Sequence, residues 1–440
     1  MAARLKSFWQ TINASYWFYP ALFALFALLL ASVTIWLDRT GRSAWLSELG
    51  WSEQARPEGA SNMLTVIAGS TIGVASTVFS ITIAAVAYAS GNYGPRLLTN
   101  FMEDRGNQLS LATFIGTFVF AITTLRTIRI GEEADLLQNG LAPAGDFVPQ
   151  LSLLTAYLLM AISVAVLVYF LHHIPASIRI GTVLEGIGNR LLREIGETYP
   201  DPDRGRIVPE APEGRAVVAA RVGYVQRVDH ARLERIAHAA GGHIRLGVRT
   251  GDFVHSRIAL AFWADDDQRD DLREDEIRAC FTLGALRTPA QDLHFLIDEL
   301  VEIGLRALSP GINDPFTAIT AIHWLGAATA ELGRRDLART LKEPLYPGEE
   351  RLTLRDSDFA HFVTRGFGTM RSAVATSPAA ALVMFEALAD TAATLRDEVR
   401  VKSLRTEGEQ LMRQARLALA GPDLERVEAR YHSFLEGIGP

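Results

Sequence analysis

Four long apolar stretches dominate the first third of the chain, and none of them contains a charged side chain. They are Phe18–Leu37, residues 62–90, Gly106–Leu125 and Phe147–Leu171. Each reaches the roughly 20 residues that a helix needs to cross a hydrocarbon core about 30 Å thick. The pattern therefore predicts four transmembrane helices within residues 1–171. The class predicted is an α-helical integral membrane protein in contact with a lipid bilayer.

The orientation follows from the positive charges that flank these stretches. With four spans, the N-terminus and the long C-terminal region share one side of the membrane. That side carries Arg4, Lys6, Arg96, Arg105, Arg179, Arg190 and Arg193, and the other carries Arg39, Arg42, Arg56, Arg126 and Arg129. The small excess favours cytoplasmic termini. We therefore expect a multi-pass membrane protein with both termini in the cytoplasm.

Small and hydroxyl-bearing residues recur at helical spacing along the second stretch. They are Thr65, Gly69, Gly73, Ser76, Thr77, Ser80, Ala84 and Ala87. The third stretch repeats the pattern with Thr113, Gly116, Thr117, Thr124 and Thr127. Such a stripe is typical of a packing seam between helices, and a wet stripe that lines a pore between subunits has the same composition.

The pore-lining candidates are therefore taken from these two stretches. They are Thr65, Gly69, Gly73, Ser76, Thr77, Ser80, Thr113, Thr117 and Arg126. Arg126 is included because an ionisable side chain near the end of a span is a functional candidate. Snorkelling of its guanidinium to the interface is the alternative explanation.

The pattern changes after the fourth span. Residues 172–214 are predicted to form an amphipathic stalk helix, followed by a linker rich in proline and charged residues. Residues 215–264 alternate apolar and polar positions and predict a small β-rich module, with a short helix after Asp229 that ends at Gly241. The G-D-F-V turn at 251–254 resembles the barrel-sandwich modules that carry biotin or lipoate. Those modules need an acceptor lysine, which this one lacks.

Residues 265–440 are predicted to form a helical domain, with helices from Ile277 to the end of the chain. Leu293, Leu296, Ile297, Leu300, Ile303, Gly304 and Ala307 form one core-facing stripe. In A-L-S-P-G-I-N-D-P-F-T-A (307–318), Pro310 and Gly311 stop that helix. Asn313 or Asp314 can cap the next helix, because Pro315 is suited to a first helical turn. We therefore expect a tight helix–turn–helix corner, and a cytoplasmic region of α+β type.

This corner and two further motifs resemble the DUF2254 family of predicted bacterial membrane proteins. The other motifs are G-A-L-R-T-P-A-Q-D (284–292) and S-G-N-Y-G-P-R-L-L-T-N-F (90–101). The resemblance covers most of the chain. It implies a four-span inner-membrane protein with a cytoplasmic C-terminal region, and it implies no particular activity.

The motifs single out Arg287, Asp292, Asn313 and Asp314 as candidate residues of the cytoplasmic region. One helix separates the first two from the last two, so the two motifs meet only if neighbouring helices fold back. A structural role, as corner and salt bridge, is one interpretation. The other is binding of a ligand or an ion.

Composition excludes several other classes of function. The net charge is −7, which does not suggest a surface for nucleic acid. Cys280 is the single cysteine, so a disulfide framework is impossible within one chain. No glycine loop for phosphates lies in a strand–turn–helix setting, and Ser309 lacks a nucleophile elbow. We therefore expect neither an enzyme nor a bound cofactor.

Two hypotheses for function remain. The first is a homo-oligomeric ion channel or pore, lined by the second and third spans and assembled or gated by the cytoplasmic region. The second is a membrane-anchored sensing or scaffolding protein whose cytoplasmic region binds a partner or a small ligand. The sequence identifies neither an ion nor a number of subunits.

Overall fold

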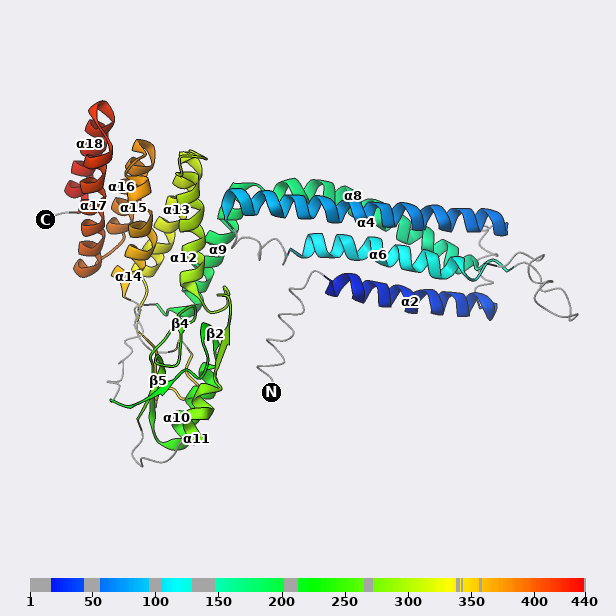
Figure 1. Ribbon diagram of the computed structural model, residues 1–440, viewed down its shortest axis with the longest axis horizontal. Coiled ribbons are helices and arrows are strands. Elements are labelled where there is room, and N and C mark those ends of the chain that lie inside the picture. Colours follow the sequence, from blue (N-terminus) through cyan, green and yellow to red (C-terminus); the bar gives the residue numbers. More distant parts are fainter. Residues whose placement is uncertain are drawn as a thin grey trace, which may run out of the picture. The chain divides into compact units, whose positions relative to one another are not determined.

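The computed structural model describes residues 17–42, 56–94, 104–128, 147–201, 213–264, 272–337, 341, 343–355 and 358–438. The chain divides into two compact units, Met1–Arg179 and Ile180–Pro440 (Figure 1). Much of the sequence that bears on membrane orientation, at 1–16, 43–55, 95–103 and 129–146, lies outside the described residues, as do the linker at 202–212 and the acidic segment at 265–271.

The described part of the first unit consists of four helices. They are α2 (Phe18–Arg39), α4 (Pro57–Tyr93), α6 (Arg105–Leu125) and α8 (Gln150–Ser177). All four are long and apolar enough to cross a membrane, as the hydrophobic pattern predicted. Helix α6 is the most buried and packs against α2, α4 and α8.

Polar contacts tie the helices of this bundle together. The Asp38 carboxylate at the end of α2 accepts hydrogen bonds from the backbone N–H groups of Leu151 (2.9 Å) and Ser152 (3.0 Å), and so caps the N-terminus of α8. Asp104 caps α6, and its Oδ2 lies 2.8 Å from His173 Nε2 of α8. These contacts provide hydrogen-bond acceptors for N–H groups at the N-termini of the helices, which would stay unpaired in apolar surroundings.

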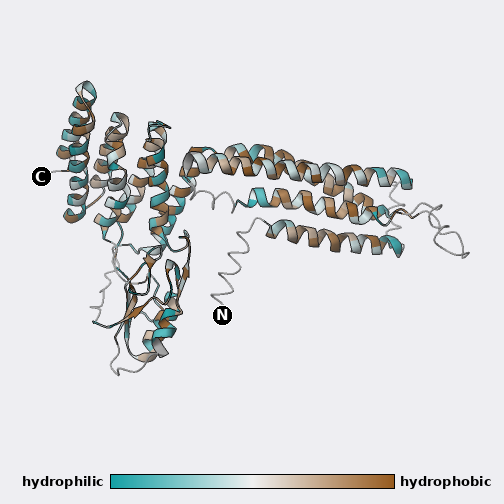
Figure 2. Ribbon diagram, viewed as in Figure 1, coloured by the Kyte–Doolittle hydropathy of each residue, from teal (hydrophilic) through white to brown (hydrophobic). Residues whose placement is uncertain are grey.

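The outward faces of α2 and α8 carry large apolar side chains. Exposed examples are Leu25, Phe26, Leu29 and Val33 on α2 and Leu158, Val164, Val168 and Leu171 on α8. Both helices are strongly hydrophobic along most of their length (Figure 2). Faces of this composition are suited to contact with lipid chains.

The second unit contains a stack of helices and a smaller sheet region (Figure 1). The long helices are α9 (Ile180–Thr198), α12 (Leu293–Ala307), α13 (Pro315–Gly333), α16 (Pro378–Ala393), α17 (Glu398–Ala418) and α18 (Gly421–Ile438). A further run has α14 (Phe359–Val363), the π-helix η2 (Thr364–Gly368) and α15 (Thr369–Val374) in succession. The seven residues predicted to form the apolar stripe of α12 are all buried.

The helix predicted as a stalk is α9, and it is part of this stack. Its apolar face is formed by Leu184, Ile187, Leu191 and Ile195, all of which are buried. The helix packs against α12 and α13. An amphipathic pattern alone could not distinguish this packed position from that of a free-standing stalk, because both need one apolar face.

The sheet region is built from two small sheets with one hydrophobic core. The first has the order β1-β5-β3-β7 and the second β4-β2-β6. The strands are β1 (Arg215–Val218), β2 (Gly223–Val228), β3 (His243–Leu246), β4 (Phe253–Val254), β5 (Ala259–Ala264), β6 (Phe281–Gly284) and β7 (Leu352–Thr353), with helices α10 (His230–Ala240) and α11 (Leu272–Arg278). Asp229 caps α10 and Gly241 ends it in the left-handed conformation, as predicted.

The expectation of helix from Ile277 to the end of the chain is wrong at β6 and β7. Strand β6 pairs antiparallel with β2, and β7 pairs parallel with β3. Both strands are short, at 4 and 2 residues. Their hydrogen-bond partners are far away in the sequence, so local periodicity gave no indication of them.

Candidate functional site

Arg287 and Asp292 meet in the loop that joins β6 to α12. Asp292 is the N-cap of α12, and its Oδ1 accepts a hydrogen bond of 3.1 Å from the Phe295 backbone N–H. Its Oδ2 accepts two hydrogen bonds from Arg287, from Nε at 3.1 Å and from Nη2 at 2.7 Å. The structure therefore brings together the first two of the four predicted motif residues.

The ion pair continues into a chain of charges. Arg287 Nη1 donates to Oδ2 of Asp298 at 2.6 Å, and Asp298 lies six residues after Asp292 on α12. Asp298 also accepts from Arg365, whose Nε and Nη2 each lie 2.7 Å from its carboxylate oxygens. Arg365 lies in the π-helix η2. The network therefore includes a π-helical turn, a backbone feature that is frequent at functional sites.

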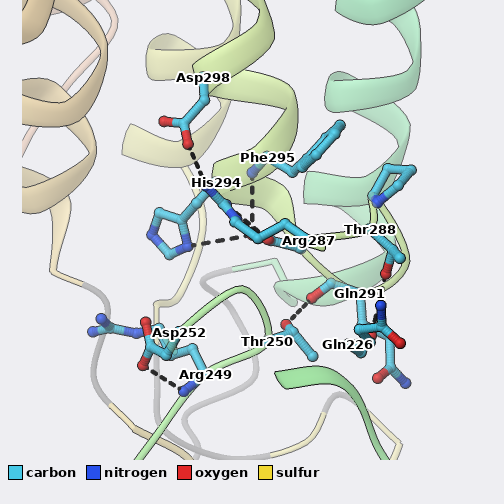
Figure 3. A network of polar contacts seen from close by, with 12 residues as sticks. Gln226, Arg249, Thr250, Asp252, Arg287, Thr288, Gln291, His294, Phe295 and Asp298 are labelled. Atoms are coloured by element: carbon cyan, nitrogen blue, oxygen red, sulfur yellow. Dashed lines mark hydrogen bonds and ion pairs between the residues drawn. The ribbon is translucent and has the colours of Figure 1, made fainter. Parts of the chain in front are cut away.

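The sheet region closes over the ion pair at Gly251. A side chain at this position would collide with Asp292 Oδ2, and its Cβ would lie 3.0 Å from Arg287 Nε. Gly251 also has a φ of +89°, which favours glycine. The adjoining Thr250 hydroxyl donates to the Gln291 carbonyl (Figure 3). The backbone of the β3–β4 loop thus lies directly on the Arg287–Asp292 pair.

Gln291 and Gln226 fix the loop that carries Arg287. Gln291 has a φ of 59°, and its side-chain Oε1 accepts a hydrogen bond of 3.1 Å from the Val228 N–H. Gln226 Nε2 donates to the Leu286 carbonyl at 2.8 Å. Strand β2 therefore holds the loop that carries Arg287, and α12 holds its guanidinium through Asp292 and Asp298.

The network is largely excluded from water. The side chain of Asp292 is 0% exposed, that of Arg287 14% and that of Asp298 16%. Burial raises the pKa of Asp292, and the charge and hydrogen bonds of Arg287 oppose that rise. Burial lowers the pKa of Arg287 and the Asp292 carboxylate raises it, with a net shift upward. Arg287 and Asp292 form a buried ion pair, so loss of either partner leaves an uncompensated charge.

His294 lies beside the pair in the first turn of α12. Its Nδ1 is 3.9 Å from Asp292 Oδ1, and its ring stacks on Phe362 with centroids 5.2 Å apart. Burial, followed by the charge of Arg365, lowers the pKa of His294 to about 2. The imidazole is therefore neutral at physiological pH.

The second motif pair lies at the opposite end of α12. Asn313 adopts a φ of 49°, and Asp314 caps α13 by accepting from the Thr317 N–H at 3.2 Å and the Thr317 hydroxyl at 2.6 Å. Helix α12 has 15 residues, or about 22 Å, between the two motifs. Asp314, rather than Asn313, supplies the cap. The structure does not bring Asn313 or Asp314 to Arg287.

The small-residue stripe of α4 lies on the face that its own bundle leaves uncovered. Thr65, Gly69, Gly73, Ser76, Thr77 and Ser80 are all exposed. A Cβ built on Gly69 or Gly73 meets no atom within 4 Å. The opposite face of α4, with Leu64, Ile67, Ala75 and Val78, is buried.

The stripe of α6 faces inward instead. The Thr117 hydroxyl lies 2.9 Å from that of Ser163 on α8, and a Cβ on Gly116 would touch the Phe23 carbonyl of α2 at 3.4 Å. Thr113 is half-buried and donates to the Leu109 carbonyl, whereas Arg126 is exposed at the C-terminal end of α6. This geometry favours packing as the role of Thr117.

The sequence pattern did not indicate Asp298, Arg365, Gly251 or His294 as members of this site. Asp298 lies six residues after the cap, on the same helix, and its spacing alone does not indicate a partner. Arg365 follows Asp298 by 67 positions. The sequence around Gly251 indicates only a turn. Contacts of this kind depend on the tertiary fold.

These observations define a helical membrane protein with a buried ionic network in its second unit. The family model described as "Predicted membrane protein (DUF2254)" matches residues 13–390. The chain belongs to this family. Uncharacterized proteins of Mycobacterium bovis and Mycobacterium tuberculosis are each 30% identical to it over 376 residues, which is 83% of this chain and 70% of theirs. No solved structure matches the chain significantly.

Proposed function

We propose that this protein forms a homo-oligomeric pore for ions, in which subunits meet along the outer face of α4. The observation that carries the proposal is the position of the small-residue stripe, on a face of α4 that its own subunit leaves open. We further propose that the pore lies in the bacterial inner membrane with both termini in the cytoplasm. The second unit would then assemble or gate the pore from the cytoplasmic side.

A comparison of outward faces supports this assignment. Helices α2 and α8 direct large apolar side chains outward, as lipid contact favours. A stripe of glycine, serine, threonine and alanine runs along the outward face of α4 from Thr65 to Ala87, over about 33 Å of helix. Exposed apolar side chains such as Val66, Phe79 and Ile83 flank it. Small residues let neighbouring helices approach closely, and hydroxyl groups tolerate water. This face is therefore better suited to other subunits and a central path than to lipid.

The hydroxyl groups of the stripe are compatible with a partly dry resting path. Thr65, Thr77 and Ser80 donate to carbonyl oxygens of their own helix, four residues earlier, at 2.8, 3.0 and 2.9 Å. They therefore need no water to satisfy their donors. The stripe carries no charged side chain, so selectivity would depend on the width of the path and on hydroxyl and carbonyl dipoles.

Cysteine accessibility along α4 tests the pore. Cys280 is buried, and burial raises its pKa to about 12; it would still be replaced by alanine to give a clean background. Single cysteines at positions 74–88 would be treated with a small aqueous thiol reagent in reconstituted vesicles. We expect reaction at 76, 80, 84 and 87, with a change in ion flux, and protection at the buried Val78.

The proposal fails if those four positions resist the reagent, because the stripe is then a dry seam. Cysteine at Val164, on the outward face of α8, serves as a lipid-facing control, since an aqueous reagent should not reach it. Oligomeric state in detergent gives an independent measure: a monomer that conducts ions would also contradict the proposal.

The sensing hypothesis is the second candidate, and a different observation favours it. The Arg287–Asp292 network joins the sheet region to α12 and to η2. A ligand bound beside this network could therefore alter the contact between the sheet region and the helical stack. A protein without ion flux, but with a ligand that changes its stability, would support this second function.

A further inference from the structure

The corner between α12 and α13, residues 308–316, exposes apolar side chains. Phe316 is 75% exposed and Ile312 is 43% exposed. Asp314 is the one charged residue of this segment, and its carboxylate is engaged as the cap of α13. The corner is therefore an apolar surface patch of the second unit. Exposure alone does not identify what covers the patch, because Val399 on α17 is as exposed as Phe316.

The backbone of the corner is also suited to apolar surroundings. Most of its N–H groups donate to carbonyl oxygens within residues 304–309, at 2.7 to 3.1 Å: those of Leu308, Ser309, Ile312, Asn313 and Asp314. The prolines at positions 310 and 315 have no N–H group that would need an acceptor. An unpaired N–H is costly in contact with lipid chains. The corner can therefore approach an apolar medium with most of its donors already satisfied.

Helices α9 and α13 run parallel and begin at the same level. Gly188 of α9 lies against the ring of Trp324, because a Cβ built on this glycine would collide with the ring. The same offset in sequence recurs past the far ends of the two helices, where the Asp336 N–H donates to the Pro200 carbonyl at 3.1 Å. The corner, which directly precedes α13, therefore lies beside the start of α9 at Ile180.

The start of α9 is tied to the end of an apolar helix. Helix α8 ends at Ser177 and α9 begins at Ile180, so at most about 10 Å of chain separates them, whatever the angle between the two helices. Ser177 lies six residues after Leu171, the last residue of the fourth apolar stretch, or about 9 Å along the helix. The polar layer on one side of a bilayer is roughly 5 to 8 Å thick. When α8 spans the hydrocarbon core, its end therefore reaches the membrane surface.

We propose that the corner inserts Phe316 and Ile312 into the headgroup layer of the bilayer and so anchors the second unit to the membrane surface. Lipid is the partner because the chain itself holds this end of α9 at the end of the α8 span. Interfacial segments bury apolar side chains about 5 to 10 Å into the boundary between headgroups and acyl chains. The cap at Asp314 leaves the corner no charge that would recruit anionic lipid, so phosphatidylcholine alone should suffice. The proposal requires that α8 crosses the membrane, and it is independent of the pore.

Fluorescence quenching by lipid tests the anchor in the full-length protein. Gly311→Cys offers a label site that keeps both apolar side chains, because Gly311 is exposed and a Cβ built on it meets no atom within 4 Å. The variant, with Cys280→Ala, would carry an environment-sensitive label and be reconstituted in phosphatidylcholine nanodiscs. We expect emission at a shorter wavelength than in detergent-free buffer, quenching by doxyl-labelled lipid and protection from aqueous iodide. Doxyl groups near the headgroup should quench more strongly than those at the chain end.

Val399→Cys, labelled in the same way, is the matched control. Val399 lies at the opposite end of α13, because the neighbouring Arg400 donates from Nη1 to the Gly333 carbonyl at 2.7 Å. Helix α13 has 19 residues, so this end is about 28 Å from the corner. Iodide should quench the label at position 399 and doxyl-labelled lipid should not. Equal quenching by lipid at positions 311 and 399 would overturn the proposal.

Substitutions of the two apolar side chains show whether they hold the corner in lipid. Ile312→Ser and Phe316→Ser, combined in the protein labelled at position 311, should reduce quenching by lipid and increase quenching by iodide. Val399→Ser should change neither. The proposal is wrong if the combined variant is quenched by lipid as strongly as its parent. It is also wrong if the label at 311 is protected from iodide but not quenched by lipid, because a second copy of the chain would then cover the corner.

Discussion

Asp292 and Asp314 perform the same local task in different surroundings. Each caps a helix by accepting from the N–H three residues later, at 3.1 Å for Phe295 and 3.2 Å for Thr317. The two helices, α12 and α13, pack against each other. Asp292, however, is wholly buried and paired with Arg287, whereas Asp314 is half-buried and bonded to Thr317.

The difference shows that a capping aspartate can carry two separate roles. Asp314 does not need its negative charge, because its partners are an N–H group and a hydroxyl, and the hydroxyl can also accept from an amide N–H. Asp292 also needs its negative charge, because it neutralises a buried guanidinium. Substitution by asparagine keeps the capping oxygen and removes the charge, and so separates the two roles.

The largest effect is expected for Asp292→Asn. Asparagine caps a helix as well as aspartate does, but Arg287 would lose its main counter-charge and keep only Asp298. We expect the free energy of unfolding to fall by about 3 kcal/mol, measured by thermal unfolding of the full-length protein. Asp314→Asn is the matched control and should change it by less than about 0.5 kcal/mol. Equal losses at the two positions would contradict this comparison.

Gly251→Ala should be nearly as damaging, because the added methyl collides with the Asp292 carboxylate. We expect a loss of more than about 2 kcal/mol, from the positive φ and the collision together. Gly241→Ala is the control, since Gly241 has a φ of +68° and no atom within 4 Å of a built Cβ. It should lose only about 1 kcal/mol. Similar losses would show that the collision is relieved by movement of the loop.

The pH dependence of stability should reveal His294. Its pKa is lowered from 6.5 to about 2, so below pH 6.5 the unfolded chain binds a proton that the folded chain does not. The free energy of unfolding should therefore decrease as the pH is lowered. This residue alone should account for a loss of about 2 kcal/mol at pH 5.

His294→Phe should remove that part of the acid sensitivity. The rise in the pKa of Asp292 acts in the opposite direction, and the lowered pKa of His230 in the same direction, but both groups are present in the two proteins. Unfolding curves between pH 7.5 and 5 measure the difference. Parallel loss of stability in wild type and variant would show that His294 gains a proton in the fold.

A smaller effect is expected for Asp314→Ala, with a loss of about 1 kcal/mol from the missing cap. Pro315→Ala, the next residue, should cost only a few tenths of a kcal/mol, because alanine is tolerated in a first helical turn. Hydrogen exchange of the first-turn amides of α13 would locate both effects. A loss of several kcal/mol for Asp314→Ala would show that Asp314 has a buried ionic partner after all.

The sequence by itself determined the features that depend on neighbours within about one helical turn. The four apolar stretches gave α2, α4, α6 and α8, and the apolar stripe gave the buried face of α12. The caps at Asp229 and Asp314 were predictable because a capping side chain bonds an N–H three residues away. Such contacts have a fixed spacing, so a single sequence shows them.

Only the tertiary structure decided which of these local features meet. Strands β6 and β7 exist because β2 and β3 offer partners across long gaps in the sequence. Arg365 reaches Asp298 over 67 positions, and Gly251 covers an ion pair that forms in another loop. The stripes of α4 and α6 have similar compositions, yet the first is exposed and the second is buried or half-buried. Spacing along one helix cannot distinguish them, because burial depends on which helices pack against each face.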